Sequence, residues 1–547
     1  MPSLPSTEAP EADDVVIVGA GAGGAAMAWR LARAGISVTC LEQGGWVDPD
    51  DTPSKHPAWE LARQTTHHPN PNTRMNGWDY PVEQSDAAIK PLMYNAVGGS
   101  TLHWGAHFPR FRPSDFRARS LDGVADDWPL DYWDLAPYYE ENDRIMGVSG
   151  IHGDPGNPPR EPRQTSPLPI GEGGRRMAAA FDRLGWHWWV SDAAINSTPY
   201  GEGWKGAGRQ GAGRLACNHC GPCDVGCPVQ ARASTDITYW PLALSAGATL
   251  LTEARVFGVE ADASGRVTGV AFHDARGNAR RIKAQIVVLA ANGVGTARLL
   301  LLSNLGNRSG LVGRRLMHHP TGMATGVFAE RMDGFRGPFA TSILCQHFYE
   351  GNATRGFARG FQMQLVRSDA PLGTAVGVYL PRVPWGAAHH DRFLAVFGKT
   401  ASLTVTTEDL PREDNRVVLD DSLTDRMGVP APKMIYSLDD NTRRMIAFGL
   451  QRAREAFEEA GAIEVLTQDL VTEAGFHLMG TARMGEDPER SVTDSWNRAH
   501  DHPNLLIADG SVFVTAGALN PTPTIQALSP RAADALIRDR RDVRGAA

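Results

Sequence analysis

The chain has 547 residues, 42% hydrophobic and 21% charged, with a formal net charge of −8. This size and composition predict about two or more folded domains and exclude a disordered or coiled-coil protein. Like charges form no run of the kind that binds nucleic acid, and no apolar stretch approaches the roughly 18 residues that span a bilayer. Because the N-terminus is acidic and unlike a secretion signal, we expect a cytoplasmic protein without a transmembrane segment.

The first predicted elements form a βαβ unit. The β-branched run at 15–18 predicts a strand, 25–34 predicts a helix and 37–41 predicts a second strand. A GxGxxG motif after the first strand lets the backbone approach a pyrophosphate at the helix N-terminus, and an acidic side chain about 20 residues later can bind a ribose hydroxyl. This pattern predicts dinucleotide binding without separating NAD from FAD. The candidate residues are Gly19, Gly21, Gly24 and Glu42.

The middle of the chain has weaker signals. Residues 45–215 are rich in Pro, Gly and Trp without clear periodicity, which predicts long loops and short helices. The segments 248–256 and 267–281 predict strands of a small antiparallel unit, and the apolar run 286–289 predicts a fully buried strand. Further elements are predicted as helices at 299–302, 441–460 and 522–536 and a strand at 505–508.

A series of short motifs follows the βαβ unit in order. They are Val97–Trp104 (VGGSTLHW), Asp127–Pro129 (DWP), Leu289–Gly293 (LAANG), Gly313–Pro320 (GRRLMHHP), Asp414–Val417 (DNRV), His477–Thr481 (HLMGT) and Leu519–Thr522 (LNPT). With these motifs the chain resembles the glucose–methanol–choline (GMC) flavoenzyme family over essentially its whole length. It looks most like the large subunits of membrane-associated sugar and sugar-acid dehydrogenases, which also carry a cysteine cluster before a Cys-Pro.

The resemblance implies an α/β fold: a Rossmann-like FAD-binding domain and a discontinuous α+β substrate domain built on an antiparallel sheet. The FAD-binding domain would comprise residues 1–110, 212–325 and 472–547, including a cysteine-rich loop at 214–234, and the substrate or cap domain residues 111–211 and 326–471. FAD is the implied cofactor. Its further binding residues would be Gly98, Gly99, Ser100, His103, Asn292, Asp509, Gly510 and Pro521.

The resemblance also implies the catalytic pair. Oxidation of an alcohol requires a base for the hydroxyl proton, and histidine suits this role because its ordinary pKa of about 6.5 lies near neutrality. His477 occupies the family's catalytic-histidine motif, and Asn520 stands where a second active-site residue is placed to hold the substrate oxygen. His103 stands where some members join a histidine covalently to the flavin. A covalent link and an unlinked neighbouring histidine both stay open.

Four of the six cysteines lie within eleven residues. Their spacing, C-x2-C-x2-C-x3-C-P, is that of bacterial ferredoxins and favours an iron–sulfur cluster. Structural zinc usually draws cysteine pairs from separated segments, and disulfides are disfavoured without a signal peptide, but zinc and free thiols stay open as alternatives. The spacing departs from that of the resembling dehydrogenases, whose cluster has three irons, so [3Fe–4S] and [4Fe–4S] are both retained. The candidate ligands are Cys217, Cys220, Cys223 and Cys227.

These observations lead to one main functional hypothesis. The protein would oxidise a CH–OH group of a sugar, sugar acid or polyol and pass electrons through the cluster to a cytochrome or quinone. The resemblance adds a small subunit that could carry the chain to the periplasm or membrane. A dehydrogenase or oxidase of a bulky apolar alcohol with structural cysteines, and a non-catalytic electron-transfer flavoprotein, are the alternatives. The sequence does not name the substrate.

Overall fold

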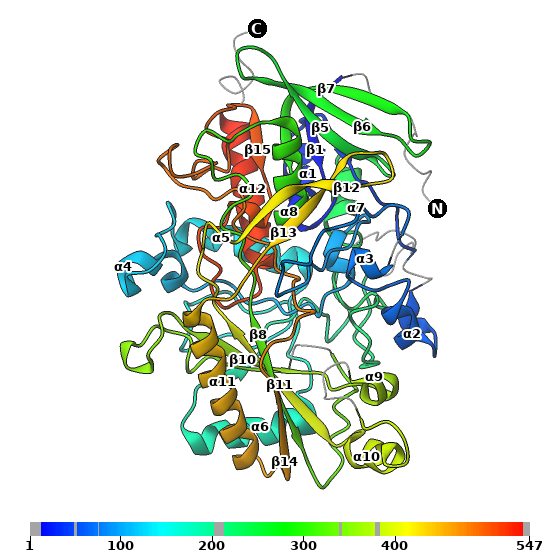
Figure 1. The fold of residues 1–547 in the computed structure, drawn as a ribbon, viewed down its shortest axis with the longest axis vertical. Coiled ribbons are helices and arrows are strands. Elements are labelled where there is room, and N and C mark those ends of the chain that lie inside the picture. The colour runs from blue at the N-terminus through cyan, green and yellow to red at the C-terminus, as the bar shows by residue number, and fades with distance from the viewer. Residues whose placement is uncertain are drawn as a thin grey trace.

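The structure is a computed structural model that describes residues 12–48, 52–74, 76–201, 213–338, 342–377 and 383–539. Its ribbon has two lobes (Figure 1), with a large mixed sheet in the upper lobe and an antiparallel sheet in the lower one. Within the described ranges, no helix combines the length and the apolar character that a membrane crossing requires. The ends of the predicted FAD-binding domain, 1–11 and 540–547, lie outside the described residues.

The N-terminal βαβ unit forms the centre of the first sheet. Strand β1 (Ala12–Val18) pairs in parallel with β2 (Val38–Leu41) and with β7 (Ala279–Leu289), and helix α1 (Ala22–Arg33) joins the first two strands. The second half of β1 is completely buried, as expected for a parallel strand covered on both faces. The predicted βαβ unit is thereby confirmed.

Strand β7 joins the parallel and antiparallel parts of this sheet. Its first half pairs antiparallel with β6 (Val267–His273), which in turn pairs with β5 (Arg255–Ala261). Its second half pairs in parallel with β15 (Leu505–Ile507). The prediction of one antiparallel unit is wrong at its start, because β4 (Thr249–Leu251) pairs in parallel with β2. A three-residue apolar strand carries no periodicity from which its direction could have been read.

The second sheet is antiparallel, with the order β14-β8-β11-β10-β9-β3. Helices α11 (Asp440–Glu459) and α6 (Gly171–Leu184) pack against this layer. The boundary predicted after residue 325 falls inside β8, although this strand pairs along its length with β11 and β14 and belongs wholly to the antiparallel sheet. The strands are β3 (Trp188–Val190), β8 (Thr321–Val327), β9 (Ile343–Cys345), β10 (Phe361–Val366), β11 (Thr400–Thr407) and β14 (Glu464–Gln468).

Two helices between residues 45 and 215 are longer than the expected short ones. Helix α5 (Tyr132–Met146) has 15 residues and α6 has 14. The Asp131 side chain accepts hydrogen bonds from two backbone N–H groups in the first turn of α5, and Gly147 ends the helix with a φ of 68°. Pro137 within α5 and the glycines that open α6 hid the helical pattern in the sequence.

The predicted helix at 441–460 and the closing helix are confirmed as α11 and α12 (Thr522–Arg538), and the helix predicted at 299–302 is the end of α8 (Asn292–Ser303). Strands β12 (Arg416–Thr424) and β13 (Pro430–Ile435) form a separate two-stranded sheet. The remaining helices are α2 (Trp59–Gln64), α3 (Pro71–Arg74), α4 (Ala118–Asp122), α7 (Tyr239–Ser245), α9 (Pro371–Val376) and α10 (His389–Val396), with 3-10 turns at Pro53–Lys55, Gly99–Leu102, Pro113–Phe116, Ala353–Arg355 and Gly510–Val512.

Candidate active site

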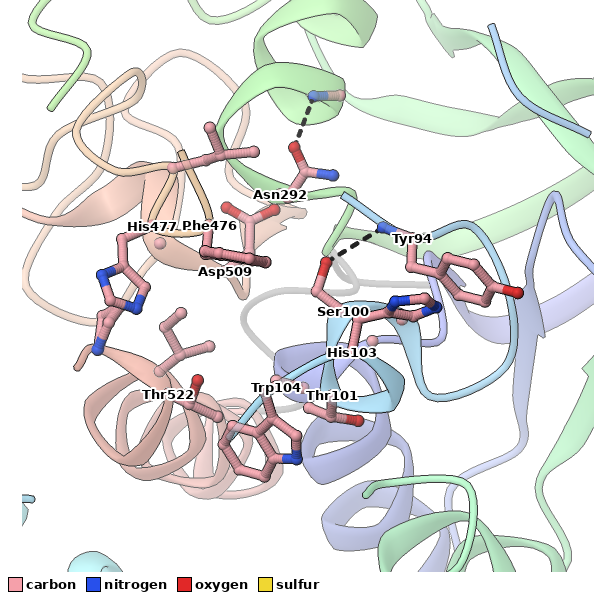
Figure 2. A pocket seen from close by; sticks show the side chains of 18 of the residues that line it. Tyr94, Ser100, Thr101, His103, Trp104, Asn292, Phe476, His477, Asp509 and Thr522 are labelled. Atoms are coloured by element: carbon pink, nitrogen blue, oxygen red, sulfur yellow. Dashed lines mark hydrogen bonds between the residues drawn. The ribbon is translucent and has the colours of Figure 1, made fainter. Parts of the chain in front are cut away.

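A deep cavity runs between the carboxyl ends of the first sheet and one face of the antiparallel sheet. The empty volume is about 2220 Å³ when open solvent at its mouth is included. Figure 2 shows His477 on one side of it and Ser100, His103 and Tyr94 on the other. The predicted residues in its wall are Gly19, Gly21, Glu42, Gly99, Ser100, His103, Asn292, His477, Asp509, Gly510, Asn520 and Pro521.

The two predicted glycine loops pack against each other at this cavity. A Cβ on Gly19 would lie 2.4 Å from the carbonyl oxygen of Ala290, and one on Gly24 would lie 2.0 Å from that of Gly19, so both positions require glycine. Gly21 instead meets only the Cα of Gly99, 3.9 Å away, and both of these residues line the cavity. Backbone there is open to a ligand. Gly98, with a φ of 100°, holds the second loop in place by donating from its N–H to Ala20.

Three helices begin at the cavity wall. Ala22 opens α1, Asn292 opens α8 and Thr522 opens α12, and all three residues line the cavity. The first N–H groups of a helix lack partners within the helix and carry partial positive charge. This arrangement favours an anionic group such as the pyrophosphate of a dinucleotide.

Glu42 lies at the end of β2, where a ribose would be expected. One carboxylate oxygen accepts from the backbone N–H of Ala20 at 2.9 Å and the other from that of Gly44 at 2.9 Å. Burial nevertheless raises the pKa of Glu42 to about 7. Each oxygen keeps a further lone pair for a ribose hydroxyl, so the residue fits the predicted role.

Asp509 and Asn292 fix the turn at the start of α8. Asp509 accepts a hydrogen bond from the Thr296 hydroxyl at 2.5 Å, and Asn292 accepts one from the Val294 N–H at 2.9 Å. Figure 2 shows both side chains at the same cavity edge. Burial raises the pKa of Asp509. These bonds show that the two residues shape the wall.

His103 lies at the far end of the second glycine loop. Its ring packs on Tyr94, with 4.0 Å between the ring centroids, and its side chain is buried (Figure 2). Burial lowers its pKa well below 6.5, so the imidazole is neutral near pH 7. A neutral imidazole at the cavity wall suits both a histidine joined covalently to the flavin and an unlinked histidine beside it. The covalent link stays a prediction.

The backbone around His477 is held from two sides. The carbonyl of Leu478 lies so close to Gly293 and Gly510 that a Cβ on either would approach it to within 2.8 Å. On the other side, Met479 and Met317 exchange backbone hydrogen bonds of 3.1 and 2.9 Å. The histidine loop is therefore fixed against both the α8 turn and the segment that leads into β8.

The second histidine of the site is His319, which the motif analysis did not single out. Its Nε2 lies 3.1 and 2.9 Å from the carbonyl oxygens of Ala516 and Gly517, and its Nδ1 lies 2.6 Å from Nδ1 of His477. Two carbonyl acceptors require that Nε2 carries the hydrogen. Burial lowers the pKa of His319 to about 4, so its Nδ1 is an acceptor near pH 7.

This bond determines the tautomer of His477. Its Nδ1 must donate to His319, and burial holds its pKa well below 6.5, so its Nε2 is an unprotonated acceptor. The Asn520 amide nitrogen lies 3.4 Å from that Nε2, and the Asn520 oxygen accepts from Gln362 at 3.5 Å. The arrangement can take a proton at Nε2 beside an oriented amide donor.

The sheet face opposite the glycine loops carries both polar and apolar side chains, the latter including Met323 on β8 and Val366 on β10. On β10 and β11, Gln364 pairs directly with Thr404, and the next pair on the same face includes Thr406. These three side chains, with Thr321 on β8, line the cavity. His107, which follows the second glycine loop, also lines it and was not predicted. This wall offers hydrogen-bonding groups beside the histidine pair.

The four predicted metal ligands behave differently from one another. Cys223 is buried, Cys220 is exposed, and Cys217 and Cys227 are half-buried. Burial, together with the nearby Cys227 and Cys220, raises the pKa of Cys217 to about 11. In the described ranges, no three His, Cys, Asp or Glu side chains are gathered closely enough to hold a metal ion. The arrangement thus does not support the predicted ligand set.

Comparisons with known proteins match the same regions. Models described as GMC oxidoreductase match residues 201–321 and 411–529, and one for an NAD(P)-binding Rossmann-like domain matches residues 17–72. The chain is 41% identical to 2-methyl-1,2-propanediol dehydrogenase of Mycolicibacterium austroafricanum, covering 98% of this chain and 97% of that one. It is 31% identical to the fructose dehydrogenase large subunit of Gluconobacter japonicus, covering 96% and 98%.

Solved structures of flavoenzymes share the fold. A formate oxidase from Aspergillus oryzae aligns with a TM-score of 0.63 at 16% identity, over 98% of this chain and all of that one. Pyridoxine 4-oxidase from Mesorbium loti aligns with a TM-score of 0.62 at 18% identity, over 96% and 99%. The Rossmann-like fold and the FAD that the glycine loops, helix N-termini and Glu42 fit are thereby supported together.

Gly21 offers a direct test of the cofactor cradle. Gly21→Val should fold, because a Cβ there meets no protein atom within 3.8 Å. Its side chain would, however, fill the space through which a bound dinucleotide approaches the backbone. We expect at least about a tenfold loss of FAD affinity, measured by titration of the unliganded protein. Gly23→Val is the contrasting variant: its Cβ would lie 1.6 Å from the Ala508 carbonyl, so it should lower the melting temperature itself. Undiminished FAD binding by Gly21→Val would contradict the cradle.

Proposed function

We propose, because the chain belongs to the GMC oxidoreductase family, that this FAD-dependent enzyme oxidises a CH–OH group of a polyol or sugar to a carbonyl. The observation that carries the proposal is the hydrogen-bond chain that leaves the Nε2 of His477 unprotonated beside Asn520. When bound, FAD supplies the acceptor for the hydride of the alcohol carbon. The named relatives, a diol dehydrogenase and a fructose dehydrogenase subunit, support a hydroxylated substrate.

The chain's own residues would handle the proton. His477 takes the hydroxyl proton at Nε2, while its Nδ1–H stays directed at His319. The positive charge that forms on His477 is stabilised by that acceptor, because His319 is itself fixed by two carbonyl groups. Asn520 donates from its amide to the same substrate oxygen and so fixes its angle. This division makes His477 the base and Asn520 a positioning donor.

Hydrogen-bonding groups on the sheet face favour a hydroxylated substrate over the bulky apolar alcohol of the alternative hypothesis. The side chains of Gln364, Thr404 and Thr406 lie at the cavity wall, where they can exchange hydrogen bonds with the hydroxyl groups of a polyol or sugar. A non-catalytic flavoprotein would have no use for the tautomer that His319 imposes on His477.

The second part of the proposal is that the cysteine loop, residues 214–234, would hold an iron–sulfur cluster. The ferredoxin-like spacing supports this part of the proposal. The position of the cysteine loop supports it too, because Arg232 joins it to the second glycine loop: its backbone N–H donates to Cys227, and its guanidinium donates to the carbonyl groups of Thr101 and Leu102. The relative named as a large subunit supports a partner subunit. Because the thiols are not gathered as ligands, no catalytic step is assigned to them.

Replacing His477 tests the base. His477→Ala should keep FAD but lose at least about 10²-fold in the rate of flavin reduction by substrate, while Asn520→Ala should lose less. Because burial lowers the His477 pKa, the wild-type rate should hold as pH falls through 6.5 and decline only in more acidic solution. Stopped-flow flavin absorbance measures both. A near-normal rate in His477→Ala would remove His477 from the mechanism.

Replacing His319 separates tautomer control from packing. His319→Leu removes the acceptor for His477 Nδ1–H, so the proton can move to Nε2 and flavin reduction should slow by about tenfold or more. His319→Asn retains an acceptor at nearly the same place and should recover most of the rate. Equal rates in the two variants, with FAD bound in both, would show that His319 only fills space.

Metal and flavin analysis of anaerobically purified protein tests the cysteine loop and His103. Iron and sulfide should be found with FAD, and Cys220→Ser should lose them while substrate still reduces the flavin. Stoichiometric zinc without iron would contradict the cluster. Flavin that stays on the acid-denatured polypeptide, and is released in His103→Ala, would establish the covalent link, whereas complete release from the wild type would exclude it.

A further inference from the structure

His107 is a buried imidazole in the cavity wall with no hydrogen-bond partner at either ring nitrogen. Only 2% of the surface of His107 is exposed to solvent. Leaving a buried polar group unsatisfied destabilises the folded protein, so an unpartnered imidazole is retained at a cost in stability. It lies close enough to His477 for its charge to act on the pKa of that residue. His107 is therefore within electrostatic range of His477, in the wall of the same cavity.

The backbone holds His107 in place from both sides. Ala106 has a φ of 58°, which is uncommon for a non-glycine residue. Its carbonyl accepts from the N–H of Ala194 at 2.8 Å, and the Phe108 N–H donates to Asp192 at 2.9 Å. The backbone position of His107 in the wall is therefore fixed by the residues on either side of it.

The chemistry of this imidazole selects a hydroxyl group. Burial lowers the His107 pKa to about 3, so near pH 7 the ring has one N–H donor and one lone pair. A hydroxyl group can use both kinds of contact. A carboxylate would want a cation, but the arginines in the described cavity wall are already paired, Arg63 with Asp224 and Arg298 with Asp425. A neutral polyol therefore fits better than a sugar acid.

We propose that His107 binds a second hydroxyl group of the substrate while His477 and Asn520 hold the hydroxyl that is oxidised. This rests on the function proposed above and narrows its substrate class to neutral compounds that carry at least two hydroxyl groups. His107 is then a specificity residue: it distinguishes a diol from the alcohol that lacks the second hydroxyl. A site built to bond a hydroxyl discriminates strongly against an analogue without one.

The test compares 1,2-propanediol with 1-propanol as reductants of the flavin in the wild type and in His107→Leu. The wild type should favour the diol, and the variant should lower the ratio of the two second-order rate constants at least about tenfold, through the diol alone. Because no protein hydrogen bond is lost, the variant's melting temperature should be unchanged or higher. The diol should raise the melting temperature of the wild type but not of the variant.

Gln526→Met is the matched control. Gln526 is completely buried, and its side-chain oxygen has no partner, but it does not line the cavity. This variant should keep the wild-type preference for the diol whatever happens to its stability. A change in the ratio there equal to that in His107→Leu would show that the effect is not specific to His107.

Two results would overturn the inference about His107. One is unchanged rate constants for both alcohols in His107→Leu; the other is an equal loss with both alcohols, which also leaves their ratio unchanged and would assign the imidazole to the flavin or to His477. If neither alcohol, nor a panel of sugars, reduces the wild-type flavin, the proposed function fails and takes the inference with it. Wild-type reduction by the diol with an unaltered ratio in the variant rejects the inference alone.

Discussion

The site depends on close backbone approach among segments that are far apart in the chain. At the carboxyl ends of the parallel strands, Gly19 lies against Ala290 and Gly23 against Ala508, while the carbonyl of Leu478 lies between Gly293 and Gly510. Only glycine permits these approaches without a shift of backbone. As a result the first βαβ unit, the start of α8, the histidine loop and the start of α12 meet around one cavity. The predicted dinucleotide-binding and catalytic residues share this junction.

Burial determines the charge state of the groups that meet there. His319, His477 and His107 all have pKa values pushed below the ordinary value, because the charged form of each would lose its hydration. A neutral imidazole can both donate and accept. In the hydrogen-bonded pair of His319 and His477, the carbonyl groups that bind His319 therefore decide which ring donates to the other. The carbonyl groups of Ala516 and Gly517 therefore determine, through two rings, which nitrogen of His477 is free.

The sequence predicted those parts of the fold and site whose signals are local. The GxGxxG loop, Glu42, the buried strand at 286–289 and the long helix α11 each have a pattern within one segment, and the family motifs located His477 and Asn520. The direction of β4 and the length of α5 were missed because a short apolar run and an internal proline are ambiguous. His319 and His107 were missed for a different reason. The role proposed for His319 rests on a hydrogen bond to a residue 158 positions away, and that proposed for His107 rests on ring nitrogens without hydrogen-bond partners.

That absence links stability to substrate. The described cavity wall carries polar groups that the protein itself leaves partly unsatisfied, whereas the hydrogen bonds around Glu42 and Asp509 are supplied by the protein. The cofactor end is therefore organised before a ligand arrives, whereas in the binding mode we propose for His107 the substrate hydroxyl groups would complete the other end. A bound polyol would remove the penalty of burying the free nitrogens of His107, which favours the folded and liganded state together. An apolar alcohol would leave that penalty in place, because it offers His107 neither a donor nor an acceptor. Selectivity at this end would then follow from the relief of a cost that the folded protein already carries.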